Sequence, residues 1–150
     1  MKKAFGILIL SIFIVGCSWQ EYFVVENNTD SSIVVSYNLS EAKGFPIFDN
    51  ADAYMTTKSG EVDWNKKITI QDSDTTTLGF QFILPPSSIL VFGHLSNDHY
   101  SNWSQHFIND RVFNFKMMQI KMKDRNISIT KDGFDSFFKK KNGNIKFSIK

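Results

Sequence analysis

The chain has little cysteine, proline or glycine. One cysteine among 150 residues permits no intramolecular disulfide bond and no zinc site built from several thiolates. With 3 prolines and 8 glycines, collagen-like and low-complexity chains are excluded. The longest apolar run, residues 4–15, falls short of the about 20 residues that a transmembrane helix needs. The chain must therefore fold by packing alone, without a covalent staple and without a spanning helix.

Sequence signatures of common enzymes are also missing. There is no Gly-x-Ser-x-Gly nucleophile elbow, no phosphate-binding glycine-rich loop and no dinucleotide fingerprint. What the chain does have is a hydrophobic content of 42%, with 15 phenylalanines. This content excludes intrinsic disorder and is sufficient for the core of one ordinary domain. The composition predicts a packed domain and identifies no reaction.

The N-terminus has the order of a bacterial export signal. Lys2 and Lys3 precede the apolar run, which ends at Gly16 and Cys17. The stretch Ile14-Val15-Gly16-Cys17 resembles the lipobox of bacterial lipoproteins, with Ile14 in place of the usual leucine. In that family the bond before the cysteine is cut and the cysteine is acylated. The resemblance implies a cleaved signal peptide over 1–16, with the cleavage site between Gly16 and Cys17, and a covalent lipid on Cys17.

The same resemblance implies where the protein resides. A multiply acylated Cys17 would anchor the chain firmly to a membrane without spanning it. Ser18 after the cysteine is, by analogy with enterobacterial lipoproteins, compatible with the outer membrane. As a whole the chain is similar to small lipoproteins of the Bacteroidota, which are rich in Asn, Lys, Ile and Phe. We therefore expect an extracytoplasmic, lipid-anchored protein with no nucleic-acid partner and no cofactor other than the lipid.

Short runs of β-branched and aromatic residues predict that the rest of the chain is all-β. We expect residues 17–21 to be a tether, with a reach of at most about 18 Å, and 22–150 to form a single antiparallel β-sandwich of the immunoglobulin-like or a similar type. The expected strands cover 22–25, 33–39, 53–57, 67–71, 78–84, 87–93, 111–123, 125–130 and 145–149. The first two are expected to form a hairpin, and 134–141 a short helix or a turn.

Four details of this prediction can be located by residue. The apolar alternation slips by one between Met117 and Met118, which predicts a β-bulge at that point. The loop over 41–50 is expected to bury Phe45, Ile47 and Phe48. The Asn142-Gly143-Asn144 sequence predicts a hairpin turn. The pair Phe137-Phe138 is either core or an exposed interface.

Charge is unevenly divided along the chain. Residues 18–110 hold 12 acidic and 4 basic residues, a net charge of −8, whereas residues 111–150 hold 11 basic and 3 acidic residues, a net charge of +8. Five of the lysines stand in two short runs: Lys121, Lys123, Lys139, Lys140 and Lys141. Such lysines either protect strand edges from aggregation or attract an anionic surface.

All three histidines fall within thirteen residues, which makes this stretch the candidate ligand or metal loop. The loop comprises His94, Asp98, His99, Tyr100, Trp103 and His106. Imidazole and carboxylate groups suit zinc, but the spacing lacks the helical register of the known zinc motifs. Exposed aromatic rings on such a loop could instead contact a carbohydrate or a peptide.

Two functions follow as expectations. The first is a non-catalytic binding or structural accessory of the cell envelope, held at the membrane by Cys17, that docks against an envelope protein or a glycan. The second is a metal-dependent hydrolase that uses the loop from His94 to His106. The first is favoured because no catalytic motif accompanies the histidines.

Overall fold

A computed structural model describes residues 18–70, 78–101 and 110–150, and its fold is all-β. No helix within these ranges has the length and apolar character needed to cross a membrane. The elements are β1 (Gln20–Asn27), β2 (Ile33–Leu39), β3 (Phe45–Pro46), β4 (Phe48–Thr56), β5 (Val62–Ile68), β6 (Gly79–Leu84), β7 (Ser88–Ser96), β8 (Arg111–Val112), β9 (Phe115–Lys121), β10 (Asn126–Thr130), α2 (Phe134–Phe137), β11 (Lys139–Lys141) and β12 (Asn144–Ile149).

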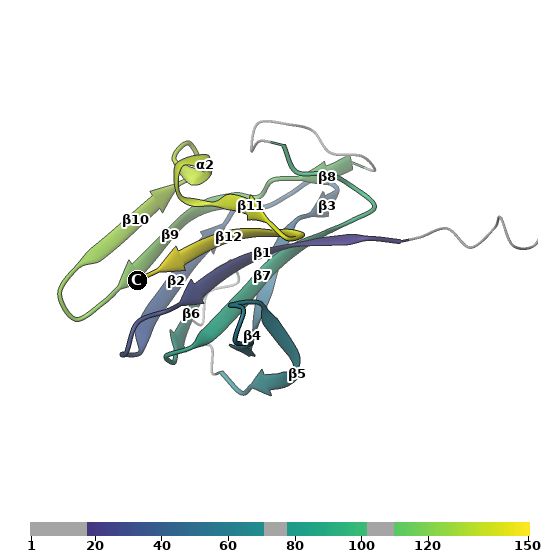
Figure 1. Cartoon of the computed structure of the whole chain (residues 1–150). Coiled ribbons are helices and arrows are strands. Elements are labelled where there is room, and N and C mark those ends of the chain that lie inside the picture. The colour runs from purple at the N-terminus through teal and green to yellow at the C-terminus, as the bar shows by residue number, and fades with distance from the viewer. Residues whose placement is uncertain (1–17, 71–77, 102–109) are drawn as a thin grey trace, which may run out of the picture.

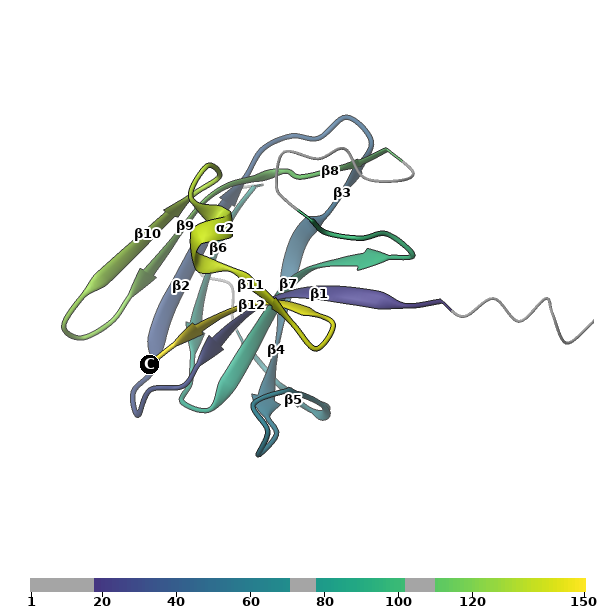
Figure 2. The same ribbon diagram turned by 45° about the horizontal axis from the view of Figure 1, so that its top comes forward.

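The strands form two large sheets and one short pair (Figures 1 and 2). The six-stranded sheet has the order β11-β12-β1-β7-β4-β5, and the four-stranded sheet has the order β10-β9-β2-β6. Most neighbouring strands are antiparallel, as expected. The pairs β1–β12 and β3–β8 are parallel, which corrects the expectation of an entirely antiparallel arrangement.

The expected hairpin between residues 22–25 and 33–39 is wrong, although both strands exist. β1 pairs with β12 and β7, whereas β2 pairs with β6 and β9, so the two strands belong to different sheets. The Asn27 side chain explains the crossing between the sheets. Its amide donates to the carbonyl oxygens of Ser31 at 2.8 Å and Leu84 at 3.0 Å. These bonds turn the chain out of one ladder and toward the other, where a hairpin turn would have kept it in the same ladder.

The core lies between the two large sheets and contains most of the phenylalanines. Side chains from both sheets are almost fully buried in one cluster: Phe23, Val25, Val35, Tyr37, Phe48, Phe82, Phe92, Phe115, Met118 and Ile120. Phe134 of α2 stacks on Phe138 with ring centroids 4.1 Å apart, and both are buried. Phe138 is therefore a core residue and not an exposed interface residue. Phe45, in contrast, is 68% exposed, which corrects its expected burial.

The predicted β-bulge is present, one residue earlier than expected. In the pairing of β2 with β9, Asn38 lies opposite Met117 while Leu39 lies opposite Phe115, so Lys116 is the extra residue. Lys116 is exposed, and Met118 is fully buried. The inserted residue returns the later apolar side chains to the core, which was the physical reason for expecting it.

The turn at Asn142-Gly143 is confirmed. Both residues have positive φ, 50° and 75°, as a two-residue hairpin turn of the mirror-image type requires. This turn joins β11 to β12 and places Lys139–Lys141 on the edge strand, where all three lysines are exposed. Lys121 lies instead on β9, an inner strand of the other sheet, so edge protection does not account for it.

Candidate ligand cleft

The two faces of the six-stranded sheet carry different side chains because successive residues of a strand point to opposite sides. On β1, Phe23 and Val25 enter the main core, whereas Val24 points to the outer face. Val24 is fully buried there in a second, smaller cluster with Ile89 of β7 and Val62 of β5. The outer face is therefore partly covered, and the cover comes from the chain segment that contains β5.

β5 forms a hairpin with β4, and a register shift between Tyr54 and Thr56 marks an irregularity in that ladder. Trp64 of β5 packs with its indole ring 4.7 Å from the ring of Tyr22 on β1 and 5.0 Å from the ring of Tyr54 on β4. Trp64 nevertheless keeps 48% of its surface exposed. The indole is thus held in place by two tyrosines and presented to solvent.

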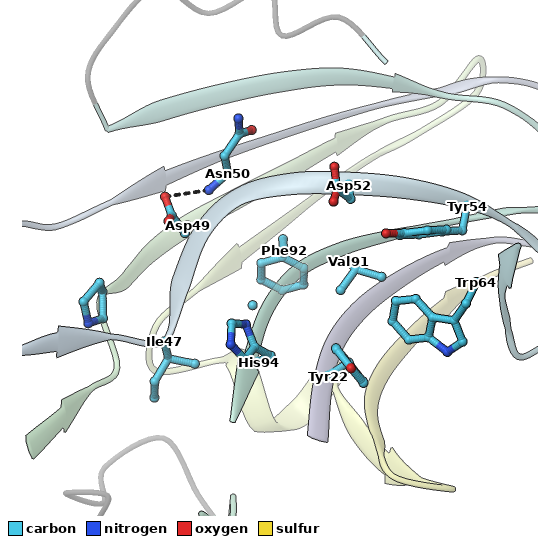
Figure 3. A pocket seen from close by; sticks show the side chains of 12 residues that line it. Tyr22, Ile47, Asp49, Asn50, Asp52, Tyr54, Trp64, Val91, Phe92 and His94 are labelled. Atoms are coloured by element: carbon cyan, nitrogen blue, oxygen red, sulfur yellow. Dashed lines mark hydrogen bonds between the residues drawn. The ribbon is translucent and has the colours of Figure 1, made fainter. Parts of the chain in front are cut away.

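A cleft of about 340 Å³ lies beside this aromatic group (Figure 3). We call it the aromatic cleft; it is lined by Tyr22, Pro46, Ile47, Asp49, Asn50, Asp52, Tyr54, Trp64, Val91, Phe92, Gly93 and His94. In the figure Trp64 and Tyr54 lie toward one end, and Ile47 and Asp49 toward the other. The volume falls within the range of small-ligand sites, about 300–1,000 Å³.

The polar end of the cleft is shaped by a break in the β4 ladder. Between Phe48 and Asp52 the pairing with β7 shifts register. Within the break the backbone N–H of Asn50 donates to Asp49 Oδ1, and that of Ala51 donates to Asn50 Oδ1, both at 2.8 Å. The side chains thus replace part of the lost ladder. Asp49, Asn50 and Asp52 are exposed, so their remaining acceptor positions face solvent.

Gly93 allows the two strands to approach closely at this point. A Cβ atom at position 93 would lie 2.7 Å from the ring of Phe48 and 2.8 Å from the carbonyl oxygen of Ile47. Any larger residue would push the start of β4 away from β7. The following N–H, that of His94, donates to the same Ile47 carbonyl at 3.3 Å. The floor of the aromatic cleft therefore depends on a glycine.

Partial burial and a nearby charge favour the protonated form of Tyr54 in the cleft, and a hydrogen bond favours that of Lys67 beside it. Partial burial, together with the nearby charge of Asp52, raises the pKa of Tyr54 above its ordinary value, so the phenol stays protonated at neutral pH. Asp52 forms an ion pair with Lys67 at 2.8 Å, and this hydrogen bond raises the pKa of Lys67. The cleft thus combines aromatic rings, carboxylate acceptors and phenol hydroxyl groups, while the Lys67 ammonium that pairs with Asp52 lies outside its lining.

The described members of the candidate ligand loop do not share one site. His94 lines the aromatic cleft, with its ring 6.4 Å from that of Tyr22. His99 lies elsewhere: its Nδ1 is 3.2 Å from Glu21 Oε1, and the Lys140 ammonium is hydrogen-bonded to the same carboxylate oxygen. Across the described ranges no three His, Cys, Asp or Glu side chains are arranged to hold a metal ion.

Two further members of the loop are buried. Tyr100 is only 6% exposed, packs edge-on against Phe23 and donates its hydroxyl hydrogen bond to Asp135, so it belongs to the core and not to an exposed ligand surface. Asp98 is 3% exposed; its Oδ1 accepts from the backbone N–H of His99 at 2.8 Å, and its Oδ2 has no hydrogen-bond partner among the residues that the structure describes. Trp103 and His106 lie outside the described residues, as do Gly16 and Cys17.

The sequence contained a signal for the cleft that the strand prediction missed. Val62 and Trp64 alternate with polar residues, which is the pattern of a half-buried strand. The strand expected over 67–71 overlaps β5 only at residues 67 and 68, so it does not include Trp64. Even with that strand assigned, the proximity of Trp64 to Tyr22 arises from sheet pairing and not from local pattern.

Comparisons with known proteins add no family to this description. The chain matches no protein-family profile, no curated protein and no solved structure at a significant level.

Proposed function

We propose that the chain is a non-catalytic, membrane-anchored accessory of a bacterial cell envelope that binds carbohydrate in the aromatic cleft. A sugar ring has an apolar face of C–H groups and a rim of hydroxyl groups. A site for it therefore needs an exposed aromatic plane beside hydrogen-bonding side chains. The aromatic cleft has both, on the outer face of one rigid sheet.

The observation that carries the proposal is the setting of Trp64. Exposed apolar surface beside polar residues is typical of ligand-binding grooves, and the Trp64 side chain is 48% exposed. Here it is packed between Tyr22 and Tyr54, so its ring is fixed before a ligand arrives. Preorganised aromatic rings lose little entropy on binding, and they contribute large contact area.

The polar side chains favour a glycan over an apolar ligand. Asp49, Asn50 and Asp52 stand on one strand beside the aromatic plane, and His94 stands on the next strand. Carboxylate and amide oxygens accept hydrogen bonds from the hydroxyl groups of a sugar, and these partners supply orientation and specificity. A purely hydrophobic ligand would leave these groups without partners, at a cost of about 1–3 kcal/mol each if they were buried.

Binding is tested by isothermal titration of the purified full chain with neutral oligosaccharides selected on a glycan array. We expect Trp64→Ala to raise the dissociation constant up to about tenfold, because stacking on an aromatic ring contributes about 0.5–1.5 kcal/mol and a tenfold change corresponds to about 1.4 kcal/mol. Trp19→Ala is the matched control, since Trp19 is 42% exposed and lies outside the cleft. Equal loss in both variants, or no binding of any glycan, would refute the proposal.

The anchor is part of the same proposal. β1 begins at Gln20, three residues after Cys17, so lipid on Cys17 would hold the domain next to the bilayer. The Cys17→Ala variant should incorporate no labelled palmitate in growing bacteria and should leave the membrane fraction. Incorporation of label by that variant would show that Cys17 is not the acylated residue. Outer-membrane residence is tested by separating the two membranes of the wild-type cells.

We also propose that the two large sheets form a single β-sandwich of the immunoglobulin-like or a similar type. The support is the shared core, in which Tyr37 of β2 lies with its ring centroid 5.6 Å from that of Phe92 on β7. Nuclear Overhauser effects between these two rings are expected in solution. Their absence would contradict the face-to-face packing of the two sheets.

A further inference from the structure

A second hollow lies on the outer side of the same sheet, and it shares no lining residue with the aromatic cleft. It has a volume of about 420 Å³. We call it the lysine pocket; it is lined by Glu26, Asn28, Thr56, Thr57, Lys58, Ser59, Gly60, Lys141, Lys146, Ser148 and Lys150. β1, β12, the end of β11 and the turn between β4 and β5 all contribute to it.

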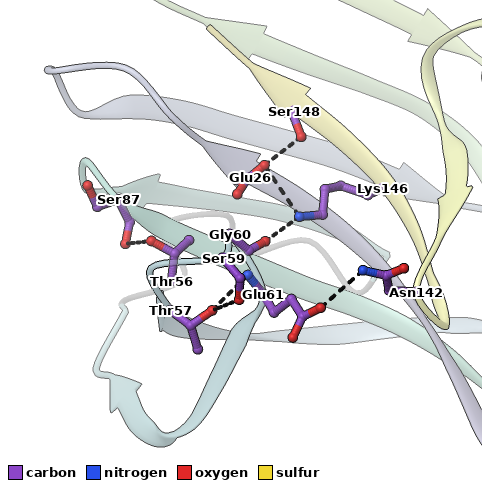
Figure 4. Close-up of polar contacts among 10 residues, drawn as sticks. All are labelled: Glu26, Thr56, Thr57, Ser59, Gly60, Glu61, Ser87, Asn142, Lys146 and Ser148. Carbon is purple, nitrogen blue, oxygen red and sulfur yellow. Dashed lines mark hydrogen bonds and ion pairs between the residues drawn. The ribbon is translucent and has the colours of Figure 1, made fainter.

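The floor of the pocket is a fixed polar network (Figure 4). Glu26 and Lys146 are largely buried and form an ion pair at 3.5 Å. Ser148 donates to Glu26 Oε2 at 2.5 Å, and the Lys146 ammonium donates to the carbonyl oxygen of Gly60. This network ties the β4–β5 turn to β1 and β12, so the walls of the pocket are held together before any ligand binds.

The remaining charge of the pocket is positive. Among the described residues that line it, Glu26 is the only acidic one, and Lys146 and Ser148 already contact its carboxylate. The side chains of Lys58, Lys141 and Lys150 are exposed, and within the described part of the chain the structure gives them no ion pair. Lys58, Lys141 and Lys150 therefore come from three separate segments to line one hollow, and no described acidic side chain pairs with them.

Hydroxyl groups complete the wall. Thr57 Oγ1 and Ser59 Oγ lie 2.8 Å apart, so one of the two hydroxyls donates to the other and the second keeps a free proton. Lysine ammonium groups together with serine or threonine hydroxyls are the donors that proteins use for phosphate oxygens. These lysines do not all serve to protect a strand edge from aggregation, because Lys58 lies in a turn and Lys150 follows an inner strand.

We propose that the lysine pocket binds a phosphate group, carried either by a phosphorylated sugar or by a phospholipid headgroup. The ammonium groups of Lys58, Lys141 and Lys150 neutralise its charge, and the Thr57–Ser59 pair donates to one of its oxygens. Glu26 orients Lys146 and stays outside the contact. The site stands independently of carbohydrate binding in the aromatic cleft, since the two hollows have no residue in common.

The test follows amide NMR resonances of the purified full chain in neutral detergent during titration with inorganic phosphate at constant ionic strength. We expect saturable shifts at Thr57, Ser59 and Gly60. The double variant Lys58→Gln/Lys141→Gln should weaken the apparent affinity about tenfold, because two charge contacts are lost. The matched control is Lys116→Gln/Lys121→Gln, which removes the same charge from exposed positions of β9 and should change the affinity less than about twofold.

Shifts that grow linearly without saturation, or equal weakening in both double variants, would overturn the proposal, because both results indicate general charge attraction. Two further probes identify the source of the phosphate. Glucose 1-phosphate that binds with the same shifts and the same loss in Lys58→Gln/Lys141→Gln supports a phosphorylated sugar. Binding only of phosphatidylglycerol vesicles, against phosphatidylcholine vesicles as the blank, supports a lipid headgroup.

Discussion

The six-stranded sheet has aromatic side chains on both faces, but the two faces are covered to different extents. On the inner face Phe23, Phe48 and Phe92 are at most 1% exposed, because the four-stranded sheet and α2 close over them. On the outer face, within the described ranges, the β4–β5 hairpin covers part of the sheet through Val62, and Trp64 remains 48% exposed. The difference shows that aromatic content alone does not define a role: the inner rings stabilise the fold, and the outer rings are available to a ligand.

Polar groups follow the same division. On the inner side the amide of Asn114 is satisfied within the protein: it accepts from the N–H of Phe48 and donates to its carbonyl oxygen, both at 3.0 Å. On the outer side Asp49, Asn50 and Asp52 keep solvent-facing oxygens. We therefore expect substitutions on the inner side to lower the stability of the fold, and substitutions on the outer side to weaken ligand binding.

The largest effect is expected for Phe134→Ala. The Phe134 ring is fully buried and lies 4.1 Å from Phe138 and 5.1 Å from both Phe113 and Phe115. Its loss should lower the free energy of unfolding by about 3–5 kcal/mol, measured by urea denaturation. Phe45→Ala is the matched control; Phe45 is 68% exposed and should cost less than about 0.5 kcal/mol. Similar costs at both positions would contradict the assignment of α2 to the core.

The second effect concerns the floor of the lysine pocket. Lys146→Met leaves the buried carboxylate of Glu26 without its ionic partner, so the free energy of unfolding should fall by about 3 kcal/mol. In Glu26→Gln/Lys146→Met no buried charge is left, and most of that loss should be recovered. Urea denaturation of the three proteins measures the difference. A double variant as unstable as Lys146→Met would show that packing, and not charge, dominates at this point.

The third effect is a dependence of stability on pH. Burial, then the hydrogen bond to Asp135, raises the pKa of Tyr100 well above its ordinary value near 10. The protonated phenol is thus favoured in the folded state, so this contribution is complete below about pH 10 and is lost as the pH rises further. Tyr100→Phe should cost about 1 kcal/mol at neutral pH through the lost hydrogen bond.

The control for Tyr100→Phe is the slope of stability with pH. Between pH 9 and 11 the variant should lose less stability than the wild-type protein, measured by thermal unfolding. If both proteins lose stability in parallel over that range, the phenol of Tyr100 does not carry the alkaline dependence.

Features set by neighbouring residues could be predicted from the sequence. The turn at Asn142-Gly143 is confirmed because that pair adopts positive φ at both positions. The bulge beside Met118 is confirmed, displaced by one residue, because a strand must keep its apolar side chains on one face. Both depend on chemistry within a few residues of chain.

Features that depend on residues far apart in the chain could not be predicted from the sequence. β1 pairs with β12, so Tyr22 lies opposite Asn144, and no local pattern selects that partner. The same limit applies to the aromatic cleft, where Tyr22, Tyr54 and Trp64 come from three strands. Closeness in sequence is also a weak guide to a shared site: β7 ends between His94 and His99, and these two described histidines have different surroundings.

A small effect on stability should accompany a large effect on binding at Trp64. Trp64 is half exposed, so Trp64→Ala should lower the free energy of unfolding by about 1 kcal/mol, the share of its ring contacts with Tyr22 and Tyr54. Chemical denaturation and carbohydrate titration of the same preparation measure both quantities. If Trp64→Ala instead unfolded the protein as readily as Phe134→Ala, the outer face would be a second core, and the division between a stabilising face and a binding face would fail.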